Sequence, residues 1–414
     1  MKIVVLSEEE FDSYSKKHIY NSYYQSSEYA KFEHDIHGYD IQYFGFVDEH
    51  EKMVGASLFL YKKILGNYKF AYAPRGMLID YDDKKVVHEV TKKLKEILRK
   101  QKFIFVKLDP PYVINQKDFE GKVIKSNENY NNLLNNLNKL GYKHLGFNIY
   151  NESNLPRWNV LSKLNSDEKI TFNKYSEDVK NKNIYAKKMA LFVKEDNELN
   201  INKFYECIEP AYHKKGKRFF EKMASSLKSK MHIYYSFLDT CEYTKNANDL
   251  YNKETEINNS LSNIIQTGDI IKYNMSKVIN DKLESDKKLT LYKKDVLAST
   301  KFLSKYPNGM VCGAALVIEE AKGVNILINY KDERYKTYNS IELLTYEIMK
   351  QFGKKGFHYI NLGSIAGNFN NETKYYESLK NKMGFNSSVI EYIGEFDLVI
   401  SPLMYKIYLR KNKK

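Results

Sequence analysis

One order of predicted elements occurs twice along this chain of 414 residues, and that repeat constrains the fold more than any other feature. Each copy is an apolar hairpin, then a helix with one apolar stripe, then a short buried strand. The first copy occupies residues 41–47, 53–61, 83–101 and 103–108. The second copy occupies residues 310–319, 323–329, 339–353 and 357–362. Because this length exceeds one typical core, we predict two related α/β domains.

A polar segment at residues 242–304 interrupts the second copy. Apolar residues recur in it with spacings of three, four and seven, at Leu250, Ile257, Leu261 and Ile264, and again at Ile271, Met275 and Val278. This spacing predicts an antiparallel two-helix coiled-coil arm, with Gly268 at its turn. We therefore expect domain 1 at 1–157, domain 2 at 158–241 and 305–414, and the arm at 242–304. The C-terminal end of the chain is free to pack back on domain 1.

The charge balance is strongly basic, with a formal net charge of +14. Lysines cluster on a predicted helix at 175–190 and in a tail at 406–414. Such a balance suits a polyanion such as nucleic acid, or an anionic membrane surface. The alternative is that lysine is simply an abundant surface residue in this sequence.

The cysteines and the hydropathy indicate a compartment. Cys207, Cys241 and Cys312 are odd in number and form no CxxC pair, which argues against disulfides or a zinc site and suits a reducing cytoplasm. The N-terminus lacks the features of a signal peptide. No apolar run approaches the roughly 18 residues of a membrane span, so we expect any membrane contact to be peripheral.

Four strings carry a family resemblance. They are QSSEYAKFEHDIHGY (25–39), YAPRG (72–76), FHYINLGSIAGNF (357–369) and KNKMGFNSSVIEYIGEFDL (380–398). Together with the polar helical segment between them, they resemble the FemABX family over nearly the whole chain. The repeated order of elements also resembles acyltransferases of the GNAT type. The resemblance implies a fold of two tandem GNAT-like α/β domains, with the helical arm inserted in the second.

The same resemblance implies an activity and partners. FemABX enzymes transfer an amino acid from aminoacyl-tRNA to the stem peptide of the peptidoglycan precursor, lipid II or its UDP-linked form. This implies a cytoplasmic enzyme at the inner face of the membrane, acting alone or with copies of itself or related transferases. The arm resembles the tRNA-binding coiled coil of seryl-tRNA synthetases. A structural or dimerising coiled coil is the alternative for the arm.

The implied reaction, aminolysis of an activated ester, needs no metal or redox cofactor, with aminoacyl-tRNA as co-substrate. The chain has no HExxH pair, GxSxG elbow or P-loop. It also lacks the QxxGxG/A loop that holds acetyl-CoA in ordinary GNAT enzymes, which favours a macromolecular donor. Two alternatives remain: a tRNA-dependent transferase with another amine or lipid acceptor, and a non-catalytic RNA-binding protein on the same fold.

Two residues are the candidates for catalysis. The resemblance places the family's lysine at Lys382, counted back from the EYIGEF segment, where a fixed ammonium would stabilise the oxyanion. Asn381 stands where the family has phenylalanine, so Lys380, preceded by Leu379, is the alternative. Asp109 ends a buried strand before two prolines. It would orient the attacking amine or act as a base, or else cap the turn that the prolines make.

Six further residues are predicted to bind substrate. Lys31 and Arg218 stand where the family contacts the diphosphate of the precursor, with Lys217 as the alternative to Arg218. Tyr72 and Arg75 belong to the YAPRG turn, which would contact substrate or act as a scaffold. Gly363 and Gly367 would shape the floor of a groove beside the catalytic lysine.

Overall fold

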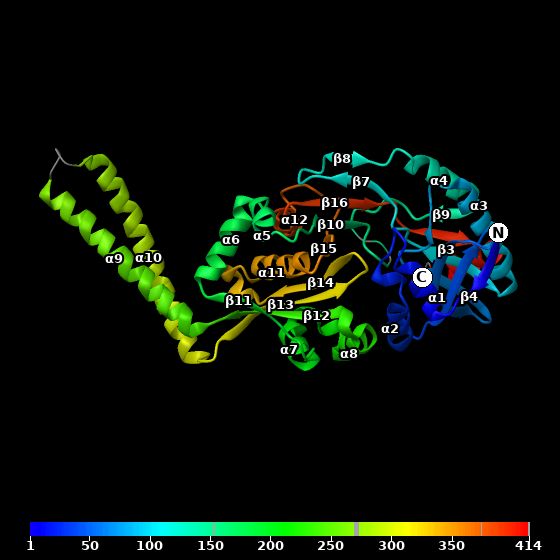
Figure 1. The fold of residues 1–414 in the computed structure, drawn as a ribbon, viewed down its shortest axis with the longest axis horizontal. Coiled ribbons are helices and arrows are strands. Elements are labelled where there is room, and N and C mark those ends of the chain that lie inside the picture. The colour runs from blue at the N-terminus through cyan, green and yellow to red at the C-terminus, as the bar shows by residue number, and fades with distance from the viewer. Residues whose placement is uncertain (151, 153, 269–272, 374, 413–414) are drawn as a thin grey trace.

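Two mixed β-sheets form the body of the protein, and a long helical hairpin projects from the second (Figure 1). The structure, a computed structural model, describes residues 1–150, 152, 154–268, 273–373 and 375–412. The first sheet has the strand order β1-β2-β3-β4-β6-β17-β9, and β5 pairs with β3. Its strands are β1 (Lys2–Val5), β2 (Asp40–Val47), β3 (Met53–Leu65), β4 (Tyr68–Ala73), β5 (Leu78–Ile79), β6 (Phe103–Leu108), β9 (Tyr142–His144) and β17 (Phe396–Val399).

The second sheet has the order β11-β12-β13-β14-β15-β10-β16-β7-β8. Its strands are β7 (Val113–Lys117), β8 (Val123–Ser126), β10 (Trp158–Lys163), β11 (Leu191–Glu195), β12 (Met231–Leu238), β13 (Met310–Glu319), β14 (Gly323–Lys331), β15 (Tyr359–Ser364) and β16 (Ser387–Tyr392). Both predicted hairpins are present as antiparallel pairs, β2 with β3 and β13 with β14.

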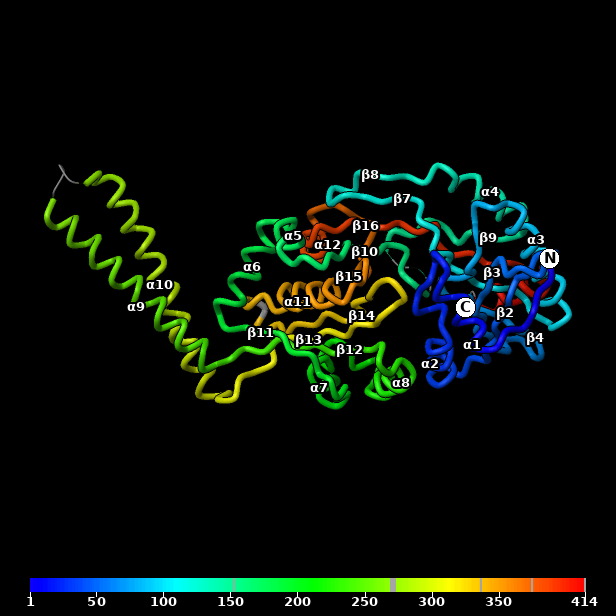
Figure 2. The backbone as a smooth tube through the Cα atoms, in the orientation of Figure 1, coloured from blue at the N-terminus to red at the C-terminus, as the bar shows by residue number. Residues whose placement is uncertain are grey.

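The two sheets exchange strands. Residues of β7 and β8, early in the chain, join the far edge of the second sheet through β16. In return β17, near the C-terminus, lies between β6 and β9 of the first sheet. Figure 2 shows this return as a red segment among the blue and cyan ones. The division at residue 157 stays a prediction, because each sheet contains strands from both halves of the chain.

Helices cover both faces of the sheets. Those that accompany the first sheet are α1 (Glu8–Ser15), α2 (Ser27–His37), α3 (Lys84–Lys100), α4 (Tyr130–Lys139) and α13 (Pro402–Lys411). Those that accompany the second are α5 (Glu168–Asn173), α6 (Glu177–Lys188), α7 (Ile201–Tyr212), α8 (Lys217–Leu227), α11 (Ser340–Lys354) and α12 (Tyr376–Met383). Residues 200–230 form two helices, because Gly216 at φ +70 separates α7 from α8.

One hydrophobic cluster is shared by the two sheets. Leu58 and Leu60 of β3 belong to it, and so do Ile233 of β12 and Leu316 of β13. Helices α2 and α8 meet over this cluster, where Phe32 and Phe219 are in edge-on ring contact at 5.1 Å. The halves are therefore joined by a common core as well as by exchanged strands.

The arm consists of α9 (Thr240–Thr267) and α10 (Met275–Lys305), packed along their length. Gly268 ends α9 as a left-handed cap at φ +61. The predicted seam is wrong at Ile257, which is 51% exposed, and Ile271 of the predicted seam lies outside the described residues. The adjacent Asn258 faces α10 instead and donates to Ser285 Oγ at 3.1 Å. A buried polar pair of this kind fixes the register of two helices at some cost in stability.

The predicted class, two α/β sheet units with a coiled-coil arm inserted in the second, is confirmed. Within the described ranges, no helix combines the length and the apolar character that a membrane crossing requires.

Candidate functional site

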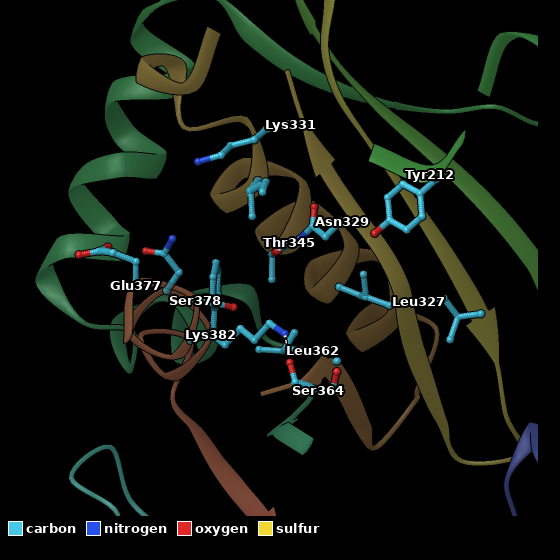
Figure 3. A pocket seen from close by; sticks show the side chains of 15 residues that line it. Tyr212, Leu327, Asn329, Lys331, Thr345, Leu362, Ser364, Glu377, Ser378 and Lys382 are labelled. Carbon is cyan, nitrogen blue, oxygen red and sulfur yellow. Dashed lines mark hydrogen bonds between the residues drawn. The ribbon is translucent and has the colours of Figure 1, made fainter. Parts of the chain in front are cut away.

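An opening between two neighbouring strands of the second sheet forms the candidate site (Figure 3). Strands β14 and β15 run parallel and pair only from Gly323↔Tyr359 to Asn325↔Asn361. Beyond these pairs a cavity of about 430 Å³ lies between the strands. Ile326, Leu327, Asn329 and Lys331 of β14 line one wall, and Leu362, Gly363 and Ser364 of β15 line the other. Where the pairing stops, the sheet itself provides a slot for a ligand.

Lys382 reaches into this cavity from α12. Its Nζ donates to the carbonyl oxygen of Ser364 at 2.7 Å, and no carboxylate in the described part of the chain lies within 4.0 Å of it. Burial lowers the pKa of Lys382 to about 8. Lys380 of the same helix is exposed and does not line the cavity. Of the two alternative lysines, Lys382 is thus the one that presents an ammonium group inside a cavity.

The two predicted glycines have different surroundings. Gly363 has φ +91, and a Cβ there would lie 3.3 Å from Lys382 Nζ, so the glycine leaves space beside the ammonium. At Gly367 a Cβ would come within 2.3 Å of the Trp158 ring. Gly367 N also donates to the carbonyl of Ile149 at 2.7 Å. Packing against Trp158 accounts for glycine at 367, and its predicted role in binding substrate stays a prediction.

Tyr72, Arg75 and Asp109 form one buried cluster at the end of the first sheet. Asp109 accepts a hydrogen bond from the Arg75 backbone N–H at 2.7 Å and another from the Tyr72 hydroxyl at 3.1 Å. Burial raises the pKa of Asp109 to about 7, although the Arg75 guanidinium acts against this shift. The Arg75 guanidinium donates to the Pro156 carbonyl at 2.6 Å and lies over the Tyr392 ring. Through these two hydrogen bonds Asp109 stabilises the YAPRG turn. Its catalytic role stays a prediction.

Lys31 and Arg218 lie on the packed helices α2 and α8, outside the cavity. Lys31 is paired with Glu8 at 2.7 Å, and its side chain is 54% exposed. Arg218 is exposed, and none of the described residues forms an ion pair with it. Lys217, the alternative, is engaged with Asn202 and Glu221. Arg218 is therefore the freer of the two cations for an anionic ligand.

Two smaller cavities continue from the Lys382 cavity. A cavity of about 360 Å³, here called the middle cavity, shares Ser364 and Ser378 with it. A third, of about 300 Å³, lies between the halves of the protein and shares Pro156 with the middle cavity. Arg75 lines this third cavity. The three cavities link the predicted catalytic lysine to the Tyr72, Arg75 and Asp109 cluster.

Many of the lysines predicted to form a basic surface are already paired with carboxylates of the protein. On α6, Lys180 is paired with Glu177, Lys182 with Asp178 and Glu342, and Lys187 with Glu347. The tail forms α13 up to Lys411, and residues 413 and 414 lie outside the described part of the chain. Most of the α6 lysines therefore have local partners already.

Sequence reasoning missed the polar lining of the Lys382 cavity. Asn329 donates to Thr345 Oγ1 at 2.9 Å, while its own Oδ1 is buried without a donor among the described residues. Lys331 and Glu377 also line the cavity. An asparagine within the apolar run ILINY was a signal for such a position, because a buried amide in a strand needs a partner.

The chain is similar to known proteins over almost its whole length. The model of the FemAB family matches residues 6–413. The chain is 22% identical to an aminoacyltransferase FemA of Staphylococcus epidermidis, over 100% of both chains. It is 23% identical to an aminoacyltransferase FemB of the same species, over 99% of this chain and 97% of the relative. A crystal structure of FemX superposes with a TM-score of 0.73 at 19% identity, covering 98% of this chain and 99% of that one.

Proposed function

This chain belongs to the FemAB family, and from that premise we propose that it transfers an amino acid from aminoacyl-tRNA to an amine of a peptidoglycan precursor. The family resemblance carried by the four motifs is confirmed, and the protein is an aminoacyltransferase. The proposal concerns the identity of the two substrates. Its product is one link of the peptide bridge between the glycan strands of the cell wall.

The observation that supports the proposal most is the ammonium of Lys382 inside the cavity between β14 and β15. In the reaction, the amine nitrogen attacks the ester carbonyl carbon and a C–N bond forms. The carbon–oxygen bond to the ribose then breaks, and the proton lost by the amine goes to the leaving hydroxyl. Negative charge develops on the carbonyl oxygen, and a fixed cation beside it lowers the barrier. Lys382 is suited to this role because no carboxylate among the described residues neutralises it.

The line of cavities suggests how two large substrates meet. The aminoacyl ester would enter the opening between β14 and β15, and the acceptor would enter through the cavity between the halves, past Arg75. Lys31 and Arg218 would then hold the diphosphate of the acceptor outside the cavities, since both cations face solvent. Either lipid II or its UDP-linked form carries that diphosphate.

The arm and the surface charge bear on tRNA and membrane. We propose that the arm engages the tRNA backbone, and that α10 makes the contact. Helix α10 is the more basic of the two, with lysines at 277, 282, 287, 288, 293, 294, 301 and 305. On α13, Leu403 is 70% exposed beside Lys406 and Arg410, which suits peripheral contact with an anionic membrane at the inner face.

A reconstituted assay tests the proposal. Purified protein is supplied with tRNA charged with a labelled amino acid and with lipid II, and the labelled precursor is measured. Transfer that ribonuclease abolishes supports the proposal. Transfer from an acyl-CoA instead, or transfer to a lipid amine but not to the precursor, contradicts the assigned donor or acceptor. Binding of RNA without any transfer contradicts the enzymatic role.

A further inference from the structure

The middle cavity contains an acidic side chain that the proposed chemistry has not used. Glu152 lines this cavity together with Tyr150, Asn154, Pro156 and Tyr375. The middle cavity shares Ser364 and Ser378 with the Lys382 cavity, and it shares Pro156 with the third cavity, which lies between the halves of the protein. Glu152 therefore lines the cavity that adjoins both of the others.

One oxygen of the Glu152 carboxylate has no partner among the described residues. Its Oε2 accepts from Asn148 Nδ2 at 2.7 Å. Its Oε1 is buried and has no hydrogen-bond donor in the described part of the chain. Burial raises the pKa of Glu152. A buried carboxylate oxygen that lacks a donor is destabilising, and it becomes favourable only when a donor, best a cation, arrives.

The nearby guanidinium groups do not supply that cation. Arg157 is paired with Glu391 and donates to the Tyr392 carbonyl. Arg75 donates to the Pro156 carbonyl and lies over the Tyr392 ring. No salt bridge to Glu152 exists among the residues that the structure describes. Its negative charge is therefore available to a ligand.

Both substrates of the proposed reaction bring a primary ammonium to this place. The aminoacyl ester carries its α-ammonium on the carbon next to the carbonyl, and the acceptor amine is largely protonated near neutral pH. The positive Lys382 would repel either group at close range, and an opposing carboxylate offsets this repulsion. We propose that Glu152, through Oε1, binds a primary ammonium group of a reacting substrate in the middle cavity. This inference rests on the proposed function for the identity of that substrate.

The variant Glu152→Gln tests the assignment. Glutamine keeps the volume and still accepts from Asn148, but it lacks the negative charge. The KM for the substrate that carries the ammonium should rise about tenfold or more, in line with a hydrogen bond to a charged group. Glu372→Gln, at an exposed position, is the matched control and should change neither KM. Thermal unfolding of both variants checks that the fold is intact, and Glu152→Asp, which keeps the charge, should lose less than Glu152→Gln.

Two measurements distinguish whether the donor or the acceptor supplies the ammonium. If it is the donor, the wild type should discriminate against Nα-acetylated aminoacyl-tRNA, and Glu152→Gln should lose this discrimination. If it is the acceptor, the KM for the precursor should rise and the discrimination should stay. Both KM values within twofold of the wild type in a folded Glu152→Gln protein would overturn the inference.

A binding titration separates this inference from the proposed function. Glycine ethyl ester and N-acetylglycine ethyl ester are added to the wild type and to Glu152→Gln, and chemical shifts are followed. Tighter binding of the free amine by the wild type alone supports the assignment, even if transfer from tRNA fails. Equal binding of the two esters by the wild type, together with a precursor KM that Glu152→Gln leaves unchanged, contradicts the assignment even if transfer succeeds.

Discussion

The parallel strand pairs of the two sheets differ in how far they stay joined. In the first sheet, β4 and β6 pair from Lys69↔Phe103 to Ala73↔Leu108 with one shift of register, which spans β6 and all but the first residue of β4. In the second, β14 and β15 separate after three pairs, and the cavity with Lys382 occupies the space between them. The same order of elements therefore gives one sheet whose parallel strands stay paired and one sheet whose parallel strands separate. The place where pairing stops, more than the order of elements, decides which copy has a site.

The lysines beside these strands differ in the same sense. Lys107 of β6 lies 3.2 Å from Asp397, so its charge is neutralised inside the first sheet. Among the described residues, Lys382 has only the Ser364 carbonyl as a hydrogen-bond acceptor. A cation whose charge a carboxylate already balances stabilises structure, whereas an unbalanced one remains available to a developing oxyanion.

The largest effect should come from removing the unbalanced cation. Lys382→Met keeps most of the side-chain length and should lower the transfer rate on the order of a hundredfold to a thousandfold, as for the loss of one oxyanion donor. Single-turnover rates with charged tRNA measure this. Lys380→Met is the control and should transfer normally. A larger loss in the control would move the catalytic role to Lys380.

The pH dependence of the transfer rate tests the difference between Lys107, which is paired with Asp397, and Lys382, which is paired with no carboxylate of the described residues. Because burial lowers the pKa of Lys382 to about 8, the transfer rate should fall by about tenfold per pH unit above that value. The folded protein binds fewer protons there than the unfolded chain, so this group makes stability rise with pH from about 8 upward. The loss of activity above about pH 8 should therefore occur while the protein stays folded. In Lys382→Arg the falling limb should move to higher pH, and an unmoved limb would exclude Lys382 as its source.

The corresponding hairpins of the two sheets also differ in how their strands are connected. Removing the long connection, the arm, tests whether it binds tRNA. Strands β2 and β3 are joined by a short turn, whereas β12 and β13 are joined by α9 and α10. Replacement of residues 246–300 by a short Gly-Ser linker should leave both sheets folded. The KM for aminoacyl-tRNA should rise roughly tenfold, because backbone phosphate contacts are lost. An unchanged KM at low salt would mean that the arm is not a tRNA element.

The smallest effect should come from Lys31, outside the cavities. Lys31→Met should raise the KM for the precursor a few-fold and leave the saturated rate near normal. Stability should change by less than about 1 kcal/mol, because the pair with Glu8 is exposed. Lys16→Met, another exposed lysine, serves as the control. A fall in the saturated rate for Lys31→Met would place Lys31 in the chemical step instead.

Sequence patterns predicted the hairpins, the stripe helices and the arm, since these depend on local periodicity. They did not predict β7 and β8, whose residues are mostly polar and are held by pairing with β16, far along the chain. They also misplaced Ile257, because a polar residue, Asn258, takes the inward position. At the site, the motifs located Lys382 and Gly363. Glu152 and Asn329 belong to no motif. The fold places Asn329 in the Lys382 cavity and Glu152 in the middle cavity next to it.

The position of β17 has a consequence for how the protein is made. This strand lies between β6 and β9, and in the described part of the chain β9 pairs with no other strand of its sheet. On the ribosome, β6 and its apolar residues emerge well before β17, because the strands of the second sheet and the arm lie between them in the sequence. Until then the first sheet keeps an open apolar edge, which is a hazard for association with other chains. We therefore expect the growing chain to need protection at that edge until β17 has been made.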